Sequence, residues 1–208
     1  MKILIADDHS IVRQGLKQII SELPEVSFID EANDGEEAYS MAMNNDYDLL
    51  ILDISMPKRS GLEVLTQIKS IKPNLKVLIL SVHEEEQYAI RVLKAGALGY
   101  LPKYVDPIEL KKAILQIRQG IRYITPDLAQ KIAIDSVIGD SRLKHEKLSF
   151  REFEVFRLIS LGKTVSQIAE EINLSVKTVS TYRKRILEKM DLDNNLDIIK
   201  YALENKII

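Results

Sequence analysis

The 208-residue sequence contains no cysteine. The chain therefore has no disulfide, no thiolate metal site and no cysteine nucleophile, and its chemistry must use other side chains. Long hydrophobic runs are also lacking, since the first apolar segment, residues 3–6, ends at two aspartates. That segment is too short for the apolar core of a signal peptide, and nothing later approaches the roughly 18 apolar residues of a membrane span. We therefore expect a cytoplasmic protein.

Neither sign of charge dominates the chain. The formal net charge is −2, with 46% hydrophobic and 29% charged residues, which is ordinary for a globular protein. This balance gives no bulk attraction to nucleic acid or to anionic membrane, although an average can conceal a local patch. The sequence shows no internal repeat and no low-complexity tract, and its length suits one large or two small domains.

Apolar runs of strand length recur through the first half of the chain, each followed by a segment of helical period. They cover residues 3–6, 26–29, 49–52, 77–80 and 98–101. Apolar strands that alternate with helices are typical of a parallel sheet covered on both faces. The pattern predicts an α/β fold for residues 1–122: one doubly wound domain with a five-stranded parallel sheet.

After Tyr123 this pattern ends. Pro126 begins another helical stretch that includes Leu128 and Ile132, and residues 135–147 are polar. We interpret residues 123–147 as a helix and a linker. From Leu148 onward only helical periodicity remains, which predicts a second domain over residues 148–208.

Helix-start signals divide this second domain into four short helices. Ser149 with Glu152, and Thr164 with Gln167, fit the capping box, while Gly162 suits the end of the first helix. Ser175 is placed to cap a longer helix that runs to about Met190. A last amphipathic helix follows Asn194-Asn195 and carries Leu196, Ile199, Ala202 and Leu203. These signals predict a small all-α domain.

Polar residues stand at the carboxyl ends of four predicted strands, where doubly wound sheets collect ligands. They are Asp7 and Asp8 after the first strand, Asp53 on the third, Ser81 on the fourth and Lys103 after the fifth. Three converging carboxylates repel one another unless a hard cation such as Mg²⁺ lies among them. A carboxylate beside that cation can attack a phosphoryl donor, and the lysine and serine can hold phosphoryl oxygens. Taken singly, Asp7 or Asp8 is better explained as a helix cap.

The residues around these positions form motifs. They read Ile5-Ala6-Asp7-Asp8-His9, Leu52-Asp53-Ile54-Ser55-Met56-Pro57, Leu80-Ser81-Val82-His83 and Gly99-Tyr100-Leu101-Pro102-Lys103. Over residues 1–122 the chain resembles the receiver domains of bacterial two-component response regulators. The resemblance implies that Asp53 is the phosphoacceptor and that a sensor histidine kinase is a partner. It also implies that Asp7, Asp8, Asp53 and the backbone carbonyl of Ser55 hold Mg²⁺.

The same resemblance assigns three further roles. Ser81 becomes the switch hydroxyl, Lys103 the phosphate-binding lysine, and Tyr100 an aromatic that reorients on phosphorylation. The sequence alone allows Tyr100 to be simply a partly buried strand residue. Two departures from the usual pattern, Pro102 before the lysine and the bulky Val82 after the hydroxyl, leave open the phosphorylation lifetime and the shape of the output face.

The segment around residues 173–190 is the most basic in the chain, with five Lys or Arg against one acid. Residues 1–125 instead carry 15 basic and 18 acidic side chains. A short helix at 167–172 and a turn at Asn173-Leu174 precede it, which predicts a helix-turn-helix whose second helix enters the DNA major groove. We expect an inner face of Val176, Val179, Ile186 and Leu187, and an outer face of Lys177, Ser180, Thr181, Lys184 and Lys189.

Leu148-Ser149-Phe150-Arg151-Glu152, Ile168-Ala169 and Leu174-Ser175-Val176-Lys177-Thr178-Val179 resemble the LuxR-type helix-turn-helix of NarL/FixJ response regulators. By position, the resemblance places Ser180, Thr181 and Lys184 at bases and Lys177 and Thr178 at phosphates. Ser180-Thr181-Tyr182 is a variant similar to the BvgA/EvgA branch. The last helix matches the segment through which such domains pair, which implies a homodimer on a two-fold promoter site.

Two alternatives belong to other classes. An aspartyl-phosphate hydrolase also combines Mg²⁺ and paired aspartates, but it places an Asp-x-Asp motif after the first strand, whereas Asp7 and Asp8 are adjacent. A signalling adaptor would bind protein only. Against these, the sequence favours a regulator that catalyses nothing beyond its own phosphoryl acceptance and loss. In it, phosphorylation draws Ser81 and Tyr100 inward and remodels the face around the fourth and fifth helices.

Overall fold

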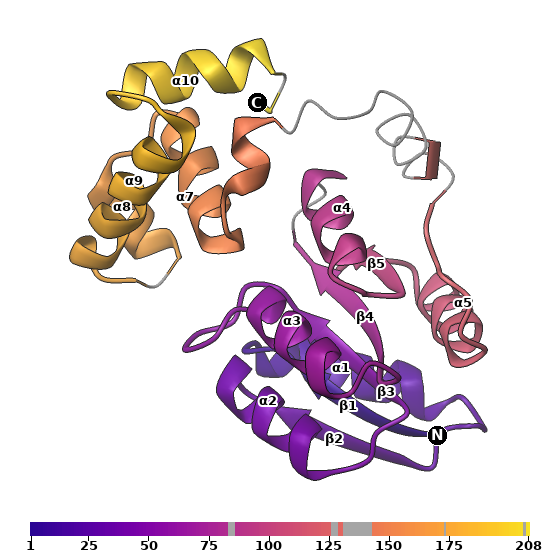
Figure 1. Ribbon diagram of the computed structural model, residues 1–208. Coiled ribbons are helices and arrows are strands. Elements are labelled where there is room, and N and C mark those ends of the chain that lie inside the picture. The colour runs from indigo at the N-terminus through magenta and orange to yellow at the C-terminus, as the bar shows by residue number, and fades with distance from the viewer. Residues whose placement is uncertain (83–85, 126–128, 131–142, 173, 206) are drawn as a thin grey trace. The chain divides into compact units, whose positions relative to one another are not determined.

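The computed structural model describes residues 1–82, 86–125, 129–130, 143–172, 174–205 and 207–208. The chain divides into two compact units, Met1–Ile138 and Gly139–Ile208 (Figure 1). The predicted helix start at Pro126, the turn residue Asn173 and the polar stretch 135–142 lie outside the described residues. Within the described part, no helix is long and apolar enough to cross a membrane.

The first unit is a five-stranded parallel sheet with the strand order β2-β1-β3-β4-β5, and helices cover both of its faces (Figure 1). Its strands are β1 (Lys2–Ala6), β2 (Phe28–Ala32), β3 (Leu49–Asp53), β4 (Lys76–Ser81) and β5 (Gly99–Pro102). Its helices are α1 (Ser10–Ser21), α2 (Gly35–Asn44), α3 (Gly61–Ile71), α4 (Glu86–Lys94) and α5 (Pro107–Arg118). The predicted doubly wound α/β fold is confirmed.

The central strands are buried because each of their faces packs against helices. Alternate residues such as Ile3, Ile5 and Ile51 belong to one hydrophobic core together with α1 and α5. The intervening residues, such as Leu4 and Leu50, are equally buried and point to the opposite face. The uninterrupted apolar character of these strands follows from this two-sided burial.

The second strand differs from its prediction. The sequence predicted residues 26–29, whereas β2 spans Phe28–Ala32 and includes the acidic pair Asp30 and Glu31. It lies at the edge of the sheet, paired with β1, and its side chains are mostly half-exposed. An edge strand need not be apolar throughout. A prediction based only on apolar residues therefore began this strand two residues too early.

The second unit is helical, as predicted. It contains the 3₁₀ helix η1 (Lys144–Lys147) and the α-helices α7 (Phe150–Ser160), α8 (Val165–Glu171), α9 (Val176–Met190) and α10 (Asn195–Glu204). Both predicted capping boxes are present, at Ser149 with Glu152 and at Thr164 with Gln167. Gly162 has a φ of 81°, a left-handed conformation that suits the end of a helix.

Aromatic packing holds the helical unit together. Phe153 and Phe156 of α7 stack with ring centroids 5.9 Å apart, and the Phe156 ring meets Tyr201 of α10 edge-on. His145 of η1 packs against the same cluster, with its Nδ1 atom 3.1 Å from the Tyr201 hydroxyl. These contacts join η1, α7 and α10 around one core. Helices α8 and α9 also bury apolar side chains, such as Ile168 and Ile186.

Candidate functional site

The acidic residues predicted to meet at the carboxyl end of the sheet do so. Asp7, Asp8 and Asp53, together with His9, place one ligand atom each within 4.8 Å of one another. Asp7 and Asp53 are buried, whereas Asp8 is partly exposed. Parallel strands end at one edge of the sheet, so residues separated by more than 40 positions share one pocket.

Lys103 lies between two of these carboxylates. Its Nζ atom is 2.7 Å from Asp7 Oδ2 and 2.8 Å from Asp53 Oδ2, and its side chain is only 9% exposed. The backbone N–H of Lys103 donates to the Ser81 carbonyl at 2.8 Å, which fixes the start of the loop after β5 against the end of β4. One ammonium group is therefore shared by two buried carboxylates.

The electrostatics of the pocket follow from burial and from this pairing. Burial raises the pKa of Asp53, an effect that Lys103 opposes and the neighbouring Asp7 reinforces. Burial would by itself lower the pKa of Lys103, but the carboxylates of Asp53 and Asp7 raise it overall. With three carboxylates and one ammonium, the pocket keeps a negative excess that a bound cation would balance.

The donor set fits a hard divalent cation. Carboxylate oxygens are the ligands that such cations prefer, and the described residues supply three of them within reach of one another. The loop after β3 begins directly after Asp53, and the Gly61 N–H at its far end donates to the Ile54 carbonyl at 2.9 Å, so both ends of the loop lie beside the acceptor residue. Ser55, whose backbone carbonyl is a predicted ligand, lies in this loop.

Ser81 and Tyr100 lie on the strands that frame the pocket. Ser81 is fully buried at the end of β4, opposite Pro102 of β5, and Asp53 is opposite Leu80. Tyr100 is 7% exposed and sits within β5, in register with Ile79. In this structure Tyr100 is thus a buried strand residue, one of the two interpretations that the sequence left open.

Two residues of the pocket were not predicted. His9 Nδ1 lies 2.8 Å from Asp8 Oδ1 and 3.3 Å from Asp7 Oδ1. Arg13 of α1 donates to the backbone carbonyl of Asp7 at 2.7 Å. His9 directly follows the two aspartates, so its position in the sequence could have predicted its place in the pocket. For Arg13 the only such indication is its position one helical turn after His9.

The helix-cap explanation of the two aspartates is not supported. The N-cap of α1 is His9, and no side chain caps this helix. Asp7 Oδ1 instead accepts the His9 backbone N–H at 2.9 Å, in the turn that precedes the helix. The two departures from the receiver pattern flank site residues in the sequence: Val82, after Ser81, is 59% exposed, and Pro102, before Lys103, is half-buried.

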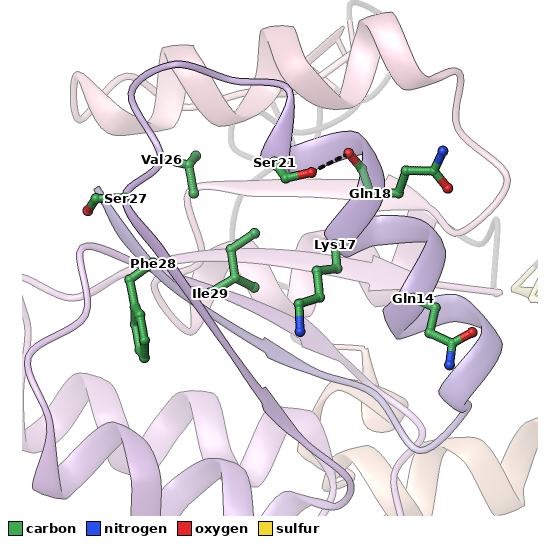
Figure 2. A pocket seen from close by; sticks show the side chains of 8 residues that line it. All are labelled: Gln14, Lys17, Gln18, Ser21, Val26, Ser27, Phe28 and Ile29. Carbon is green, nitrogen blue, oxygen red and sulfur yellow. Dashed lines mark hydrogen bonds between the residues drawn. The ribbon is translucent and has the colours of Figure 1, made fainter.

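A separate pocket lies at the open edge of the sheet, away from the aspartates (Figure 2). It is lined by Gln14, Lys17, Gln18, Ser21, Val26, Ser27, Phe28 and Ile29. Its lining comes from α1 and from the start of β2, whereas the aspartates follow the carboxyl ends of the strands. Lys17 is already paired with Glu31 at 2.8 Å, and the pocket contributes nothing to the acidic site.

In the helical unit, α8 and α9 form the predicted helix-turn-helix. The Leu174 N–H donates to the Ala169 carbonyl at 2.9 Å, and Ser175 caps α9 by accepting from the Thr178 N–H at 3.0 Å. The predicted outer residues Lys177, Ser180, Thr181 and Lys184 are all exposed. Their spacing of three, four and seven places them on one face of the helix.

The inner face of α9 was predicted only in part. Val179 and Ile186 are fully buried as expected and Leu187 is half-buried, but Val176 is 51% exposed. Met190, at the other end of the helix, is fully buried and was not predicted. Val176 is the first residue of the helix, where one flank is open. Lys189 is exposed, as predicted, and its Nζ atom lies 2.6 Å from Glu152 Oε2, which ties α9 to the start of α7.

A doubly wound sheet with a lysine-bridged acidic pocket, followed by a helix-turn-helix unit, defines a DNA-binding regulator controlled through a receiver domain. Comparison with known families agrees. Residues 3–115 match the response regulator receiver domain, and residues 146–202 match the bacterial regulatory proteins of the luxR family. The chain belongs to the two-component response regulators of the NarL/FixJ type, which combine these two domains.

Relatives match along the whole chain. Response regulator UvrY of Escherichia coli (strain K12) is 33% identical over 206 residues, covering 99% of this chain and 94% of UvrY. Oxygen regulatory protein NreC of Staphylococcus carnosus (strain TM300) is 35% identical and covers 100% of this chain and 99% of its own. The predicted likeness to the BvgA/EvgA branch stays a prediction.

Solved structures give the same result. RcsB from Salmonella enterica serovar Typhimurium, bound to promoter rprA in the presence of the phosphomimetic BeF3−, is 28% identical with a TM-score of 0.62. The match covers 97% of this chain and 98% of RcsB. The RcsB–DNA complex matches with 27% identity and a TM-score of 0.60, and covers 97% of both chains.

Proposed function

We propose that Asp53 accepts a phosphoryl group from a sensor histidine kinase, and that this modification controls promoter binding by α9. The observation that carries the proposal is Lys103, shared at 2.7 and 2.8 Å between the buried carboxylates of Asp7 and Asp53. A lysine held there meets the phosphoryl oxygens as soon as Asp53 is modified.

The acidic set suits Mg²⁺, with Asp7, Asp8, Asp53 and the backbone carbonyl of Ser55 as its ligands. When bound, the ion neutralises charge on the phosphoryl oxygens. An Asp53 oxygen forms the new bond to phosphorus while the bond between phosphorus and the donor group breaks. Lys103 would then pair with the phosphoryl oxygens in place of the Asp53 carboxylate, and the Ser81 hydroxyl would donate a hydrogen bond to them. Tyr100 would follow Ser81 as the residue that transmits the change.

The output side rests on the exposed face of α9. Ser180, Thr181 and Lys184 would face bases, and Lys177 and Thr178 phosphates, with the whole helix in the major groove of double-stranded DNA. Thr178 is half-buried, and its hydroxyl lies 2.7 Å from that of Ser175, so its contact would be made at the helix N-terminus.

We propose a homodimer on a two-fold promoter site. On α10, Leu196 is 71% exposed and Leu203 is 59% exposed, an apolar surface suited to pairing with a second copy. RcsB has been solved in a complex with DNA and as two dimers bound to two parallel DNAs. Phosphorylation would act by shifting a population toward the binding-competent state.

The parts of the chain take the following roles. Residues 1–122 would be the receiver and residues 148–208 the DNA-binding domain. Most of the predicted helix and linker, residues 123–147, lies outside the described residues, and its last residues, Lys144–Lys147, form η1 of the helical unit. The protein is no enzyme in the ordinary sense, because its pocket would act only on its own Asp53. Its promoter target places it in the cytoplasm.

The test is phosphoryl incorporation from acetyl phosphate, read as the intact mass of the full chain. Asp53→Asn should incorporate none, whereas the exposed Asp46→Asn should behave as the wild type. Incorporation that persists in Asp53→Asn would refute the assignment. Turnover of a phosphomonoester that is lost in Asp7→Ala but kept in Asp53→Ala would favour the aspartyl-phosphate hydrolase.

DNA binding is tested separately by selecting bound sequences from a random pool with beryllofluoride present. A single enriched two-fold motif, lost when Thr181 and Lys184 are both changed to alanine, is the expected result. No enrichment under these conditions would favour a signalling adaptor that binds protein only.

A further inference from the structure

The loop between β3 and α3, residues 54–60, directly follows Asp53 and contains Ser55, whose backbone carbonyl is a proposed cation ligand. Its far end is fixed by close packing. A Cβ atom on Gly61, the first residue of α3, would lie 2.0 Å from the Asp53 carbonyl oxygen, so only glycine fits there. The Gly61 N–H also donates to the Ile54 carbonyl at 2.9 Å. The loop therefore has little freedom where it enters α3.

The middle of the loop is held by α2. Lys58 has a φ of 65°, a left-handed conformation that is unfavourable for a lysine, at the centre of a turn closed by Arg59 N–H and the Pro57 carbonyl. Lys58 Nζ lies 2.5 Å from Asp34 Oδ2. The other oxygen of Asp34 accepts the N–H groups of Glu36 and Glu37, both at 2.9 Å, and so caps α2. Asp34 thus joins the loop to the start of α2.

Arg59 makes the second connection. Its guanidinium lies 4.4 Å from the centre of the Tyr39 ring and 3.0 Å from Glu36 Oε2, both on α2. The same guanidinium donates to Gln67 of α3 at 2.6 Å. A Cβ atom on Gly35 would lie 1.8 Å from the Arg59 carbonyl oxygen, so the loop backbone rests directly on α2. We call these contacts of Lys58 and Arg59 with Asp34, Glu36 and Tyr39 the α2 clasp.

We propose that Lys58 and Arg59 are positioning residues for phosphoryl acceptance, because the α2 clasp fixes the loop whose Ser55 carbonyl would meet the cation. This inference rests on the proposed function, since it needs the cation site. Lys58 pairs with Asp34 and Arg59 with Glu36, rather than with the carboxylates of the pocket. Their effect passes through the loop backbone, as with groups that orient metal ligands without touching the metal.

The sign of the expected effect separates positioning from simple electrostatics. Removing a positive charge near an acidic site should tighten cation binding, because one repulsive term is lost. Releasing the α2 clasp should instead weaken binding, because the Ser55 carbonyl is no longer held in place. The two explanations predict opposite changes in the Mg²⁺ dissociation constant of the same variant.

The experiment is an NMR titration of the unphosphorylated full chain with Mg²⁺ at constant ionic strength. Lys58→Ala should weaken Mg²⁺ binding by about threefold to tenfold, at or below the low end of the range for residues that orient metal ligands. Asp34→Asn keeps an oxygen to cap α2 but loses the ion pair, and should give the same loss. The double variant should be no weaker than either single one, since both break one contact. Lys58→Arg should restore binding.

Lys111→Ala is the matched control, because Lys111 makes an ion pair of 2.5 Å with Glu22 between two other helices of the same unit. It should leave Mg²⁺ binding unchanged. The rate of phosphorylation by acetyl phosphate should fall in Lys58→Ala at low Mg²⁺ and recover at saturating Mg²⁺. A general loss of structure would lower the rate at both concentrations.

Two results would overturn the proposal. If Asp8→Ala abolishes Mg²⁺ binding while Lys58→Ala binds as tightly as the wild type, or more tightly, the α2 clasp has no positioning role and the proposed function stands. If Asp8→Ala also binds Mg²⁺ like the wild type, the cation site itself is wrong, and the inference fails together with that part of the proposed function.

Discussion

The pocket of the receiver unit depends on one shared ammonium group. Asp7 and Asp53 are buried side by side, and the Lys103 ammonium contacts both. A buried carboxylate without a partner is costly, so breaking a buried ion pair by removing one partner typically destabilises a protein by about 3–5 kcal/mol. The arrangement of lysine and aspartates is therefore structural as well as chemical.

Lys103→Met should lower the free energy of unfolding of the receiver unit by about 3 kcal/mol at pH 7, because two carboxylates lose their counter-charge. Mg²⁺ should recover part of this loss, since a cation can replace the missing ammonium. Urea unfolding of the full chain, followed by NMR signals of the first unit with and without Mg²⁺, measures both effects. Equal stability of variant and wild type without Mg²⁺ would contradict the expectation.

Glu152 gives the helical unit a defined dependence on acid. Burial would raise its pKa, but the hydrogen bonds from Lys189 and from the Ser149 backbone and hydroxyl lower it overall. A carboxyl group with a lowered folded pKa stabilises the fold fully above its unfolded pKa. That stabilisation is lost as the pH falls from about 4.5 through the lowered folded value.

Glu152→Gln should therefore reduce stability at pH 7 by about 1 kcal/mol, the typical loss for a broken capping interaction. It should also flatten the decline below pH 4.5. Denaturant unfolding of the full chain at several pH values, read from signals of α7, tests this. A variant whose stability falls with acid as steeply as that of the wild type would show that Glu152 is not the titrating group.

Among the elements, α9 shows how far a helix can be predicted from sequence. Its N-cap, its bounds and its exposed basic face were correct, because capping and helical period are local signals. Val176 was wrongly assigned to the core, since the period cannot show how much neighbouring structure covers the first turn. For the same reason β2 was displaced: its acidic residues fit only because it lies at the edge, and edge position depends on the whole sheet.

The exposed face of α9 should separate affinity from specificity. Lys177→Ala should weaken DNA binding about equally for all sequences, and should reduce the slope of log affinity against log salt by about 0.9, as for one lost phosphate contact. Ser180→Ala should instead alter the preferred bases and leave the slope unchanged. Binding assays at several salt concentrations, with the selected motif and a scrambled one, provide the comparison. An unchanged slope in Lys177→Ala would exclude it as a phosphate contact.

At the scale of the whole molecule, the order of elements was predictable but their contacts were less so. Alternating strands and helices indicated one sheet, and the sheet topology then brought Asp7, Asp53 and Lys103 to one edge. The α2 clasp had no such signal, because Asp34 and Lys58 are 24 positions apart and neither follows a predicted strand. Its recognition required the three-dimensional positions of α2 and the loop.

The division into two compact units predicts two separable responses. The proposed binding of Mg²⁺ to the folded receiver should increase the free energy of unfolding of that unit by RT ln(1 + [Mg²⁺]/Kd), and should therefore raise the midpoint of its transition. The transition of the helical unit should not move. Calorimetry of the full chain with increasing Mg²⁺ measures both, and a common shift of all heat absorption would show that the units unfold as one.

The edge position of β2 has a consequence for handling and for mutation. An open strand edge is a template for pairing with another chain, and charged side chains are a common protection. In β2 the charged side chains are Asp30, which accepts a hydrogen bond from the Tyr47 hydroxyl, and Glu31. The pKa of Glu31 is lowered, mainly by its hydrogen bond from Lys17. Neutral replacements such as Asp30→Asn and Glu31→Gln would remove this protection from a five-residue edge strand that begins at Phe28, and should increase its tendency to pair with a second chain.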